Sequence, residues 1–389
     1  MRAAVWSANQ AGIPCLAADQ FGDVDLLEIC PNWYPLSQDY HELPDYLSQL
    51  EVAGWCYTGG LENHPRLVGA AAREVPLLGV GENTLKELRN PYLFVDGVSA
   101  AGWKSPETLS VVKGLPEGDW LLKPFRSGGG LRISKADYAH LDGDQFYLQR
   151  NIEGLPYSIS FVAVAGKAIL LGGALQFTSR TAEIYVPPVM RHESPYLFQG
   201  GITCCLQEIA PLEALQQLVD LLTAHFGLVG LCGLDLIKTE SGEIFLLELN
   251  PRYTATMELL ERQLQTSFLS LHLDACCGES LAYLKRIKGE RSEQDYFVAK
   301  QIVYTTGSFT VPEKGMQVAL GGRFLGKEQA EVLLVDLPQP GSQLPAGSPV
   351  CTVIAFGATR EECLGSLRYH AGRLAIVLDQ RKWSGYYRS

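Results

Sequence analysis

The stretch GLDLIKTESGEIFLLELNPRY, residues 233–253, carries two carboxylates in two apolar segments that a short polar turn separates. LDLIKTE and EIFLLELN predict the strands of a β-hairpin, because both are mainly apolar and Ser241-Gly242 between them is a frequent turn dipeptide. With these two residues as the loop, Asp235 lies directly opposite Glu248. The chain therefore sets two like charges against each other in its most strand-like region.

The opposed carboxylates pose an energetic problem that a cation would solve. Side chains alternate between the two faces of a strand, so Asn250 shares the face of Glu248. The other face then holds four leucines: Leu234, Leu236, Leu247 and Leu249. Opposite carboxylates repel, and a divalent cation between them removes the repulsion. Asp235, Glu248 and Asn250 offer only oxygen, which favours Mg²⁺ or Mn²⁺ over zinc. The alternative is a pair of edge-strand acids that face water.

A second stretch, LLKPFRSGGGLRI at residues 121–133, has the composition of a phosphate-binding loop. Lys123 ends an apolar strand, and Gly128, Gly129 and Gly130 follow it. Consecutive glycines let backbone N–H groups approach phosphate oxygens, and the lysine supplies a positive charge. A triple glycine also occurs at ordinary hairpin tips, and the chain has neither GxxxxGK[ST] nor a GxGxxG after a strand. Only the combination of lysine and glycines favours phosphate binding.

The segment QFYLQRNIEG, residues 145–154, predicts a strand whose backbone and apolar neighbours could hold an adenine ring. Gln149 could hydrogen-bond the exocyclic amine of the base. Taken alone, the segment is an ordinary strand.

Composition indicates a globular protein and restricts its partners. The chain has 389 residues, of which 47% are hydrophobic and 19% charged, so two or three domains are expected. The net charge of -11 argues against binding to nucleic acid or an anionic membrane. No apolar window is long enough to span a bilayer, and the N-terminus lacks the apolar core of a signal peptide. We therefore expect a cytoplasmic protein with reduced cysteines.

Three units follow from the order of the expected elements. Residues 1–85 alternate a helix at 2–11 with short strands near 14–18, 52–60 and 75–81, which predicts a Rossmann-like α/β domain. Such domains begin with a strand, so either the sheet lacks its first strand or the true start lies upstream of Met1. Residues 86–285 form the second unit, with a strand pair around the Ala165-Gly166 turn and a helix over 212–226. Residues 286–389 predict a small strand-rich α/β domain that ends in a helix from Thr359 to about Leu378.

The order of these motifs resembles the ATP-grasp superfamily, and within it the carboligases related to biotin carboxylase. The resemblance rests on the strand, lysine and glycine loop, the QRNIEG strand end, a long helix, and an aspartate followed thirteen residues later by ELNPR. It covers residues 90–280 well. DQFGDVDL at 19–26 resembles the end of the preceding domain, and PVCTVIAFGATREECLGSLRYHAG resembles the small C-terminal domain. The implied architecture is α/β and α+β, with a Rossmann-like domain, an ATP-grasp fold and a small C-terminal domain.

The resemblance also implies roles for individual residues. Lys123 would bind ATP phosphates under a mobile loop of Gly128, Gly129 and Gly130. Gln149 and the backbone of Arg150 to Ile152 would hold adenine. Asp235, Glu248 and Asn250 would bind one or two Mg²⁺ ions, and Arg252 would face the transferred phosphoryl group. The chain departs from the family pattern at Pro156, where relatives carry a glutamate for the ribose, and either Lys86 or Arg89 would replace the first phosphate-binding lysine.

The implied activity is an ADP-forming ligase that joins a small-molecule carboxylate to an amine through an acyl phosphate. Bicarbonate as acceptor would make the protein a carboxylase, and an alcohol would make it a kinase. A catalytically silent nucleotide-binding module is a further alternative. A homodimer is compatible with each of these.

Overall fold

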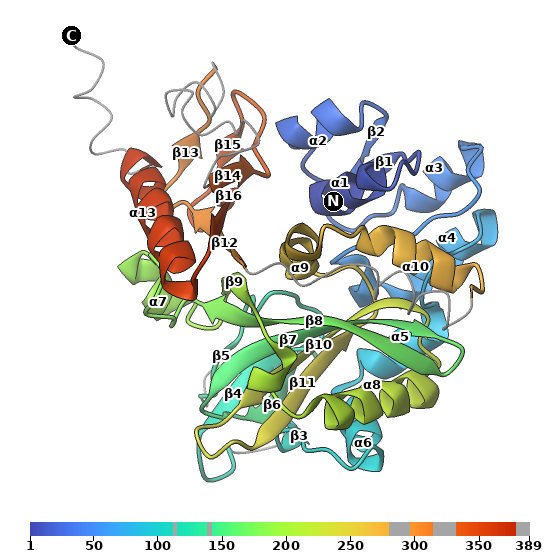
Figure 1. Cartoon of the computed structure of the whole chain (residues 1–389), viewed down its shortest axis with the longest axis vertical. Coiled ribbons are helices and arrows are strands. Elements are labelled where there is room, and N and C mark those ends of the chain that lie inside the picture. The colour runs from blue at the N-terminus through green and yellow to red at the C-terminus, as the bar shows by residue number, and fades with distance from the viewer. Residues whose placement is uncertain (112–114, 138–141, 280–295, 314–331, 379–389) are drawn as a thin grey trace.

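A computed structural model of the chain describes residues 1–111, 115–137, 142–279, 296–313 and 332–378. Its centre is an eight-stranded antiparallel sheet in the order β11-β10-β7-β8-β9-β12-β16-β14 (Figure 1). The strands of this sheet are β7 Leu155–Val164, β8 Lys167–Thr178, β9 Phe198–Cys204, β10 Gly230–Lys238, β11 Ile244–Asn250, β12 Phe297–Tyr304, β14 Val332–Val335 and β16 Pro349–Gly357. The large antiparallel sheet with segregated helices confirms the expected α+β character.

The hairpin β7–β8 forms where the sequence predicts it. Ala165 and Gly166 adopt φ values of 50° and 75°, which match the two left-handed positions of a tight hairpin turn. Both strands are almost continuously buried, so apolar side chains lie on both faces of this part of the sheet.

A smaller four-stranded sheet, β3-β6-β4-β5, carries the predicted phosphate-binding and adenine-binding segments. Its strands are β3 Thr108–Ser110, β4 Trp120–Pro124, β5 Ser134–Lys135 and β6 Phe146–Arg150. Strand β4 pairs with β6 so that Lys123 lies opposite Tyr147 and next to the strand end at Pro124. The two sheets enclose the principal cavity of the site described below.

The N-terminal region contains parallel pairing but fewer strands than predicted. Its elements are α1 Arg2–Gln10, β1 Ala17–Asp19, α2 Val24–Ile29, β2 Trp33–Pro35, α3 Leu43–Gln49, η1 Leu61–Asn63, α4 Pro65–Glu74, α5 Glu82–Leu88 and α6 Pro91–Ala100. Strands β1 and β2 are parallel. The strands expected at 52–60 and 75–81 are wrong, since only the parallel bridge between Trp55 and Leu77 joins them. Pro76 has no N–H to donate, which prevents a longer ladder.

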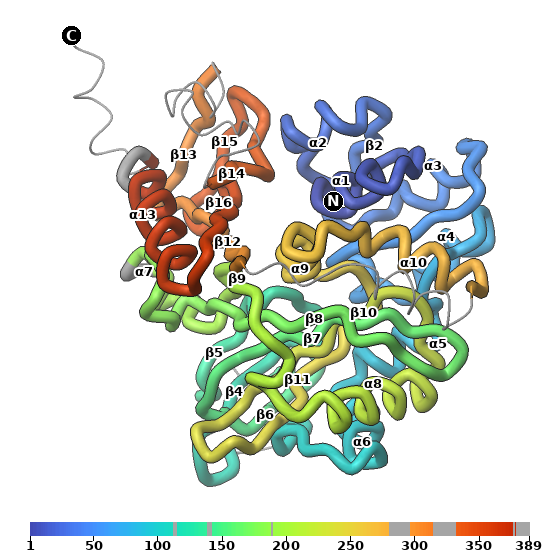
Figure 2. The backbone as a smooth tube through the Cα atoms, in the orientation of Figure 1, coloured from blue at the N-terminus to red at the C-terminus, as the bar shows by residue number. Residues whose placement is uncertain are grey.

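The C-terminal strands extend the large sheet across the expected boundary at residue 285, because β12 pairs with β9. The remaining elements are α7 Pro188–Glu193, η3 Leu206–Glu208, α9 Met257–Leu264, α10 Phe268–Cys276, β13 Phe309–Thr310, β15 Gln343–Leu344 and α13 Arg360–Leu378. Helix α13 confirms the predicted terminal helix. Figure 2 shows the N-terminal segment beside this part of the chain, and the Val24 N–H donates to the Leu337 carbonyl at 2.8 Å. The three domain limits stay predictions.

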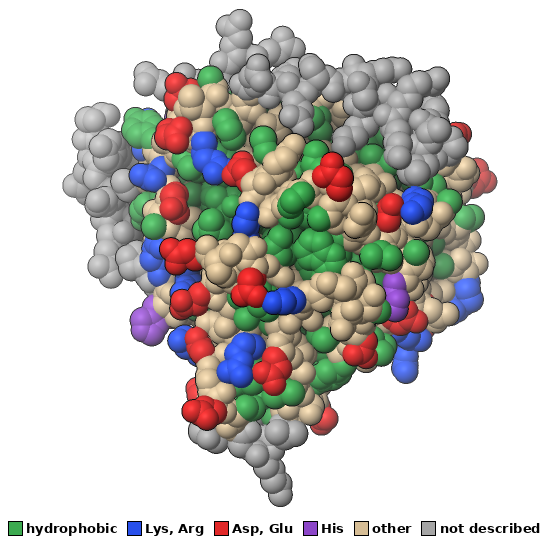
Figure 3. Space-filling view, turned by 60° about the horizontal axis from the view of Figure 1, so that its bottom comes forward, with side chains coloured by type: hydrophobic (Ala, Val, Ile, Leu, Met, Phe, Trp, Pro, Cys, Tyr) green, Lys and Arg blue, Asp and Glu red, His purple; other side chains and the backbone are tan. Residues whose placement is uncertain are grey.

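The surface carries charges of both signs. On the face shown in Figure 3, acidic and basic side chains are interspersed, with hydrophobic patches between them. Within the described residues, no helix combines the length and the apolar character needed to cross a bilayer.

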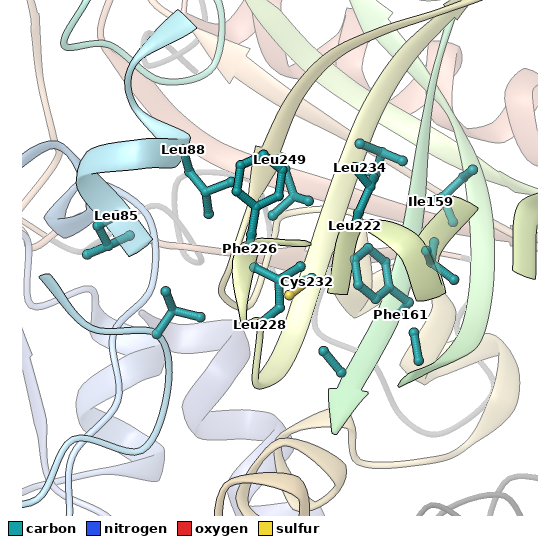
Figure 4. Packing of buried hydrophobic residues seen from close by; sticks show 14 of the residues in the cluster. Leu85, Leu88, Ile159, Phe161, Leu222, Phe226, Leu228, Cys232, Leu234 and Leu249 are labelled. Atoms are coloured by element: carbon teal, nitrogen blue, oxygen red, sulfur yellow. The ribbon is translucent and has the colours of Figure 1, made fainter. Parts of the chain in front are cut away.

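The main hydrophobic core lies between helix α8, Leu212–Phe226, and the large sheet. Pro211 precedes the helix, and Gly227 ends it in the left-handed conformation with a φ of 61°, as the sequence predicts. In Figure 4, Leu222 and Phe226 point toward Leu234 and Cys232 of β10. Packing of the helix against the sheet fixes the strand that carries Asp235.

Candidate active site

The hairpin β10–β11 pairs Asp235 with Glu248, as the sequence predicts. The loop is different from the predicted one, however. The Thr239 N–H donates to the Glu243 carbonyl at 2.8 Å, so three residues rather than Ser241-Gly242 alone form the turn. A bulge then shifts the register between Asp235 and Leu236, and this shift restores the pairing of the two acids. Because of the bulge, Leu246 is fully buried and Leu247 lines the cavity, which corrects the predicted leucine face.

Two side-chain amides hydrogen-bond the acidic pair. Asn250 donates through Nδ2 to Asp235 Oδ2 and to Glu248 Oε1, at 3.1 Å in each case. Gln176 of β8 donates through Nε2 to Asp235 Oδ1 at 2.8 Å. The amide N–H groups thus place positive partial charge next to the two carboxylates.

The surroundings drive the pKa values of the two acids apart. Burial, and after it the negative charge of Glu248, raises the pKa of Asp235 to about 7. Burial also opposes ionisation of Glu248, but Arg89 and Lys123 outweigh it and hold the Glu248 pKa below its ordinary value. Glu248 is therefore the ionised member near neutral pH, and Asp235 holds a proton at pH values below about 7.

Three basic side chains surround the acids. Arg89 Nη1 lies 3.9 Å from Glu248 Oε2, and Arg89 is held by a 2.9 Å hydrogen bond from Nη2 to the Ser127 carbonyl. Lys123 donates to Gln149 Oε1 at 3.0 Å. Arg252 donates through Nε to Glu62 Oε1 at 2.9 Å and through Nη2 to Asn250 Oδ1 at 3.3 Å.

These groups line one cavity of about 720 Å³ between the two sheets. The predicted site residues meet in its wall: Lys123, Gly128, Gly129, Gly130, Gln149, Arg150, Ile152, Asp235, Glu248, Asn250 and Arg252. The volume is ample for a nucleotide-sized ligand. Pro156, which stands at the expected ribose position, is also part of the wall.

The glycine loop is folded against the start of β9. The Phe198 N–H donates to the Gly129 carbonyl at 2.8 Å. Gly129 and Gly130 have φ values of 62° and 77°, a region that glycine adopts without strain. A Cβ on Gly130 would lie 2.0 Å from the Tyr196 carbonyl oxygen, whereas one on Gly128 would meet no atom within 4 Å.

The predicted adenine segment uses several of its polar groups within the protein. The Arg150 N–H donates to the Glu107 carbonyl at 2.8 Å, and the Asn151 N–H donates to the Asp119 carbonyl at 3.0 Å. Gln149 is only 4% exposed and accepts from Lys123. In this arrangement Gln149 orients the lysine, and its predicted contact with adenine stays a prediction.

The donor set fits a hard divalent cation. Within the described residues there is no group of three or more His, Cys, Asp or Glu side chains able to hold a metal. The two opposed carboxylates offer oxygen ligands, and phosphate oxygens would supply the others, which is the usual mode for Mg²⁺. Asn250 now turns its Nδ2 toward both acids, so its amide would have to rotate to offer its oxygen as well.

Sequence reasoning missed two residues of the site and left a third undecided. Gln176 reaches Asp235 across β7, where the small Ser158 is paired with Asp235. Glu62, 1% exposed, anchors Arg252 from the N-terminal region. A lone Gln in an apolar strand was the available signal for Gln176. Of Lys86 and Arg89, only Arg89 lines the cavity.

Solved structures with the same fold are similar to this chain at low sequence identity. The biotin carboxylase domain dimer of Hydrogenobacter thermophilus 2-oxoglutarate carboxylase, in complex with MgADP, ADP and bicarbonate, is 13% identical with a TM-score of 0.67, and the match covers 91% of this chain and 83% of that one. A Campylobacter jejuni biotin carboxylase–β-γ-ATP complex is 11% identical with a TM-score of 0.69 over 94% of this chain and 86% of that one.

A similar structure of a different kind is the L-amino acid ligase from Bacillus licheniformis. It is 14% identical, with a TM-score of 0.66 over 95% of this chain and 94% of that one. Comparison with curated protein sequences found no match. Residues 89–256 match the model of the ATP-grasp domain. This match shows an ATP-grasp domain at residues 89–256, and the similar structures show the same fold over most of the chain.

Proposed function

We propose that the protein is an ATP-dependent, ADP-forming ligase that joins a small-molecule carboxylate to an amine. The observation that carries the proposal is the pair Asp235 and Glu248, set opposite each other beside Arg89 and Lys123 in the 720 Å³ cavity. A silent binding module has little use for two opposed carboxylates, because they repel each other when both are ionised. The similar structures bound to ADP or an ATP analogue, and the similar amino acid ligase, support the same class of reaction.

In the proposed reaction, a carboxylate oxygen of the first substrate attacks the γ-phosphorus of ATP, and ADP leaves. The amine then attacks the acyl carbonyl carbon, phosphate leaves, and the amine loses a proton to solvent. A bound Mg²⁺ would neutralise phosphate charge. Asp235, Glu248 and the Asn250 amide oxygen would hold that ion.

The protein's own side chains would position the phosphates and the acyl group. Lys123, oriented by Gln149, provides a localised charge for phosphate oxygens. Arg252 provides a planar guanidinium for the transferred group, and Glu62 keeps that guanidinium fixed. N–H groups of the glycine loop would cover the phosphates.

The second substrate that ADP formation requires distinguishes the proposed ligase from a carboxylase, a kinase and a silent binding module. Purified protein with ATP and MgCl₂ is assayed for ADP release against pools of carboxylates with amines, with bicarbonate, and with alcohols. We expect release that requires both a carboxylate and an amine and that yields one amide per ADP. Release with bicarbonate alone would indicate a carboxylase, release with alcohols a kinase, and binding of MgATP without release in any pool a silent module.

Variants of the acidic pair test the metal assignment. Asp235→Asn and Glu248→Gln should each lower magnesium-dependent ADP formation by about 100-fold or more, because each removes a proposed ligand of the Mg²⁺ ion that would neutralise the phosphoryl charge. Glu243→Gln is the matched control, since Glu243 lies on the same hairpin but forms only an exposed pair with Lys104. If Asp235→Asn and Glu248→Gln were as active as the control Glu243→Gln, the proposed role of the acidic pair would be contradicted.

Small-molecule substrates, a cytoplasmic location and a homodimer complete the proposal. The net charge of -11 disfavours nucleic acid as a partner. Light scattering of the purified chain would determine its oligomeric state.

A further inference from the structure

A second cavity, of about 610 Å³, lies beside the first. Arg89 and Phe125 line both cavities, so they form the shared wall. The remaining lining comes from the start of α4, from α5, from the start of α6 and from the residue that follows Phe125. Of the residues to which the sequence gives a role, only Lys86 and Arg89 belong to this lining, and they are the two alternatives for the first phosphate-binding lysine.

The lining of this second cavity is cationic. It contains Arg66, Lys86, Arg89 and Arg126 and no Asp or Glu. This composition stands out in a chain with 43 acidic and 32 basic residues, whose charges are interspersed on the face in Figure 3. Four like charges around one cavity repel one another unless an anion enters.

Two of these four cations, Arg66 and Arg126, lack a carboxylate partner among the described residues. Lys86 pairs with Glu82 at 2.6 Å. Arg66 and Arg126 are exposed, and neither forms an ion pair with any residue that the structure describes. Arg89 is the third guanidinium, and its Nε is buried without a hydrogen-bond partner within the described part of the chain. Three guanidinium groups therefore face one cavity with unused capacity to bind anions.

The uncharged part of the lining suits a small organic molecule. Burial lowers the pKa of His64, and the nearby charge of Arg126 lowers it further, so His64 is a neutral imidazole at pH 7. Tyr92 and Phe125 add aromatic surface. Such a lining combines charge recognition with apolar contact, as ligand sites generally do.

We propose that this cavity binds the carboxylate substrate of the ligase through two or more negative charges, carried by carboxylate or phosphate groups. The inference rests on the proposed function for the identity of the ligand as a substrate. Arg89 would meet the reacting carboxylate, because its Nη1 also lies 3.9 Å from Glu248 and thus next to the proposed phosphoryl site. Arg66 and Arg126 would hold the remaining charges, since a guanidinium matches carboxylate and phosphate equally well.

Direct binding of simple anions tests the cavity without nucleotide. Calorimetric titrations of the full chain use citrate, glutarate and inorganic phosphate as probes, with acetate as the singly charged comparison. We expect at least one multiply charged probe to bind with a dissociation constant below about 10 mM and at least about tenfold more tightly than acetate. Preference for citrate or glutarate would assign a polycarboxylate, and preference for phosphate would assign a phosphorylated acid.

Charge variants locate the binding site. The double variant Arg66→Gln/Arg126→Gln should weaken binding of the preferred probe by at least about tenfold, because it removes two charge-assisted contacts. The control Arg73→Gln/Lys135→Gln removes the same net charge from exposed positions outside both cavities, and Arg73 lies on α4 like Arg66. Equal effects of the two double variants, or no effect of the first, would overturn the inference.

Titration with MgATP separates this inference from the proposed function. Nucleotide affinity of Arg66→Gln/Arg126→Gln should stay within about twofold of the unmodified protein, because neither residue lines the first cavity. If MgATP binds and no multiply charged probe does, the cavity assignment fails while the ligase proposal stands. If the probes bind and MgATP does not, the ligase proposal fails and with it the assignment of the ligand as a substrate.

Discussion

Two side-chain amides donate hydrogen bonds to Asp235, and Gln176 is the one whose replacement tests a single contact. Both Asn250 and Gln176 donate to Asp235, but Asn250 also contacts Glu248 and accepts from Arg252. Among these groups Gln176 contacts only Asp235. Its amide fixes the rotation of the Asp235 carboxylate, and such supporting contacts tune metal affinity without touching the metal.

Replacing Gln176 with Leu should raise the Mg²⁺ concentration for half-maximal ADP formation by about 10- to 100-fold, because a nearly isosteric side chain then leaves Asp235 without its donor. The rate at saturating Mg²⁺ should fall much less. Gln216→Leu is the control, since Gln216 donates to Asp220 on α8, away from both cavities. An unchanged Mg²⁺ requirement in Gln176→Leu would contradict the role of Gln176.

The raised pKa of Asp235 predicts a pH dependence of stability. Between the ordinary Asp pKa and about 7, the folded metal-free protein holds a proton that the unfolded chain has released. Stability therefore falls as pH rises through this window, and the loss is complete above pH 7. Asp235→Asn removes this loss, because an amide has no proton to release.

Thermal unfolding with EDTA should show Asp235→Asn and the unmodified protein melting together near pH 4. Above pH 7 the variant should melt at the higher temperature. Added MgCl₂ should then stabilise only the unmodified protein, because binding to the folded state adds stability. If the difference in melting temperature between the two proteins does not vary with pH, ionisation of Asp235 does not destabilise the folded protein.

At the level of elements, the hairpin β10–β11 shows how much of the site the sequence could predict. The apolar alternation and the turn residues locate both strands, and the opposed acids are found correctly. The predicted loop is one residue too short, and the bulge beside Asp235 compensates for it. A bulge depends on packing against neighbouring strands, which periodicity within the hairpin cannot reveal. Contacts that cross a third strand, such as Gln176 to Asp235, were unpredictable for the same reason.

The glycine loop offers a test at the same scale. Gly130→Ala should weaken MgATP binding by about tenfold or more, because the new Cβ would collide with the Tyr196 carbonyl and a left-handed conformation costs about 1–2 kcal/mol for a residue with a side chain. The loop would have to leave β9 and lose its place over the cavity. Isothermal titration measures the change.

Gly128→Ala is the matched control in the same loop. Its Cβ would meet no atom within 4 Å, and its φ lies outside the left-handed region. This variant should bind MgATP within about threefold of the unmodified protein, since it adds only one methyl group to open space. Similar losses in both variants would mean that the loop tolerates no side chain because of the nucleotide itself, and that its contact with β9 is unimportant.

A buried ionic cluster around Arg2 connects segments that are far apart in the sequence, and no local sequence pattern predicts it. Arg2 is 3% exposed and donates to both oxygens of Glu258, at 2.7 and 3.0 Å. Its Nε also donates to Asp336 at 2.9 Å. These contacts join the first helix to α9 and to the residue after β14, across more than 250 positions of sequence. Of the three elements only the helix that carries Arg2 is predicted from the sequence, and the contacts themselves are not, because charge pairing over such separations has no periodic signal.

Arg2→Met should lower the free energy of unfolding by about 3 kcal/mol, because it removes one partner of a buried pair while keeping an apolar stem of similar length. Glu258 keeps Arg262 at 3.0 Å and Lys300 at 3.4 Å, which limits the loss. Urea unfolding followed by circular dichroism and by tryptophan fluorescence measures it. The control Lys104→Met breaks an exposed pair with Glu243 and should cost less than about 1 kcal/mol. Because Arg2 links the first helix to α9 and Asp336, the unfolding transitions measured by the two probes should also separate in Arg2→Met, with the N-terminal region unfolding first. Coincident transitions, with a loss of unfolding free energy no larger than the control's, would show that the cluster does not hold these parts together.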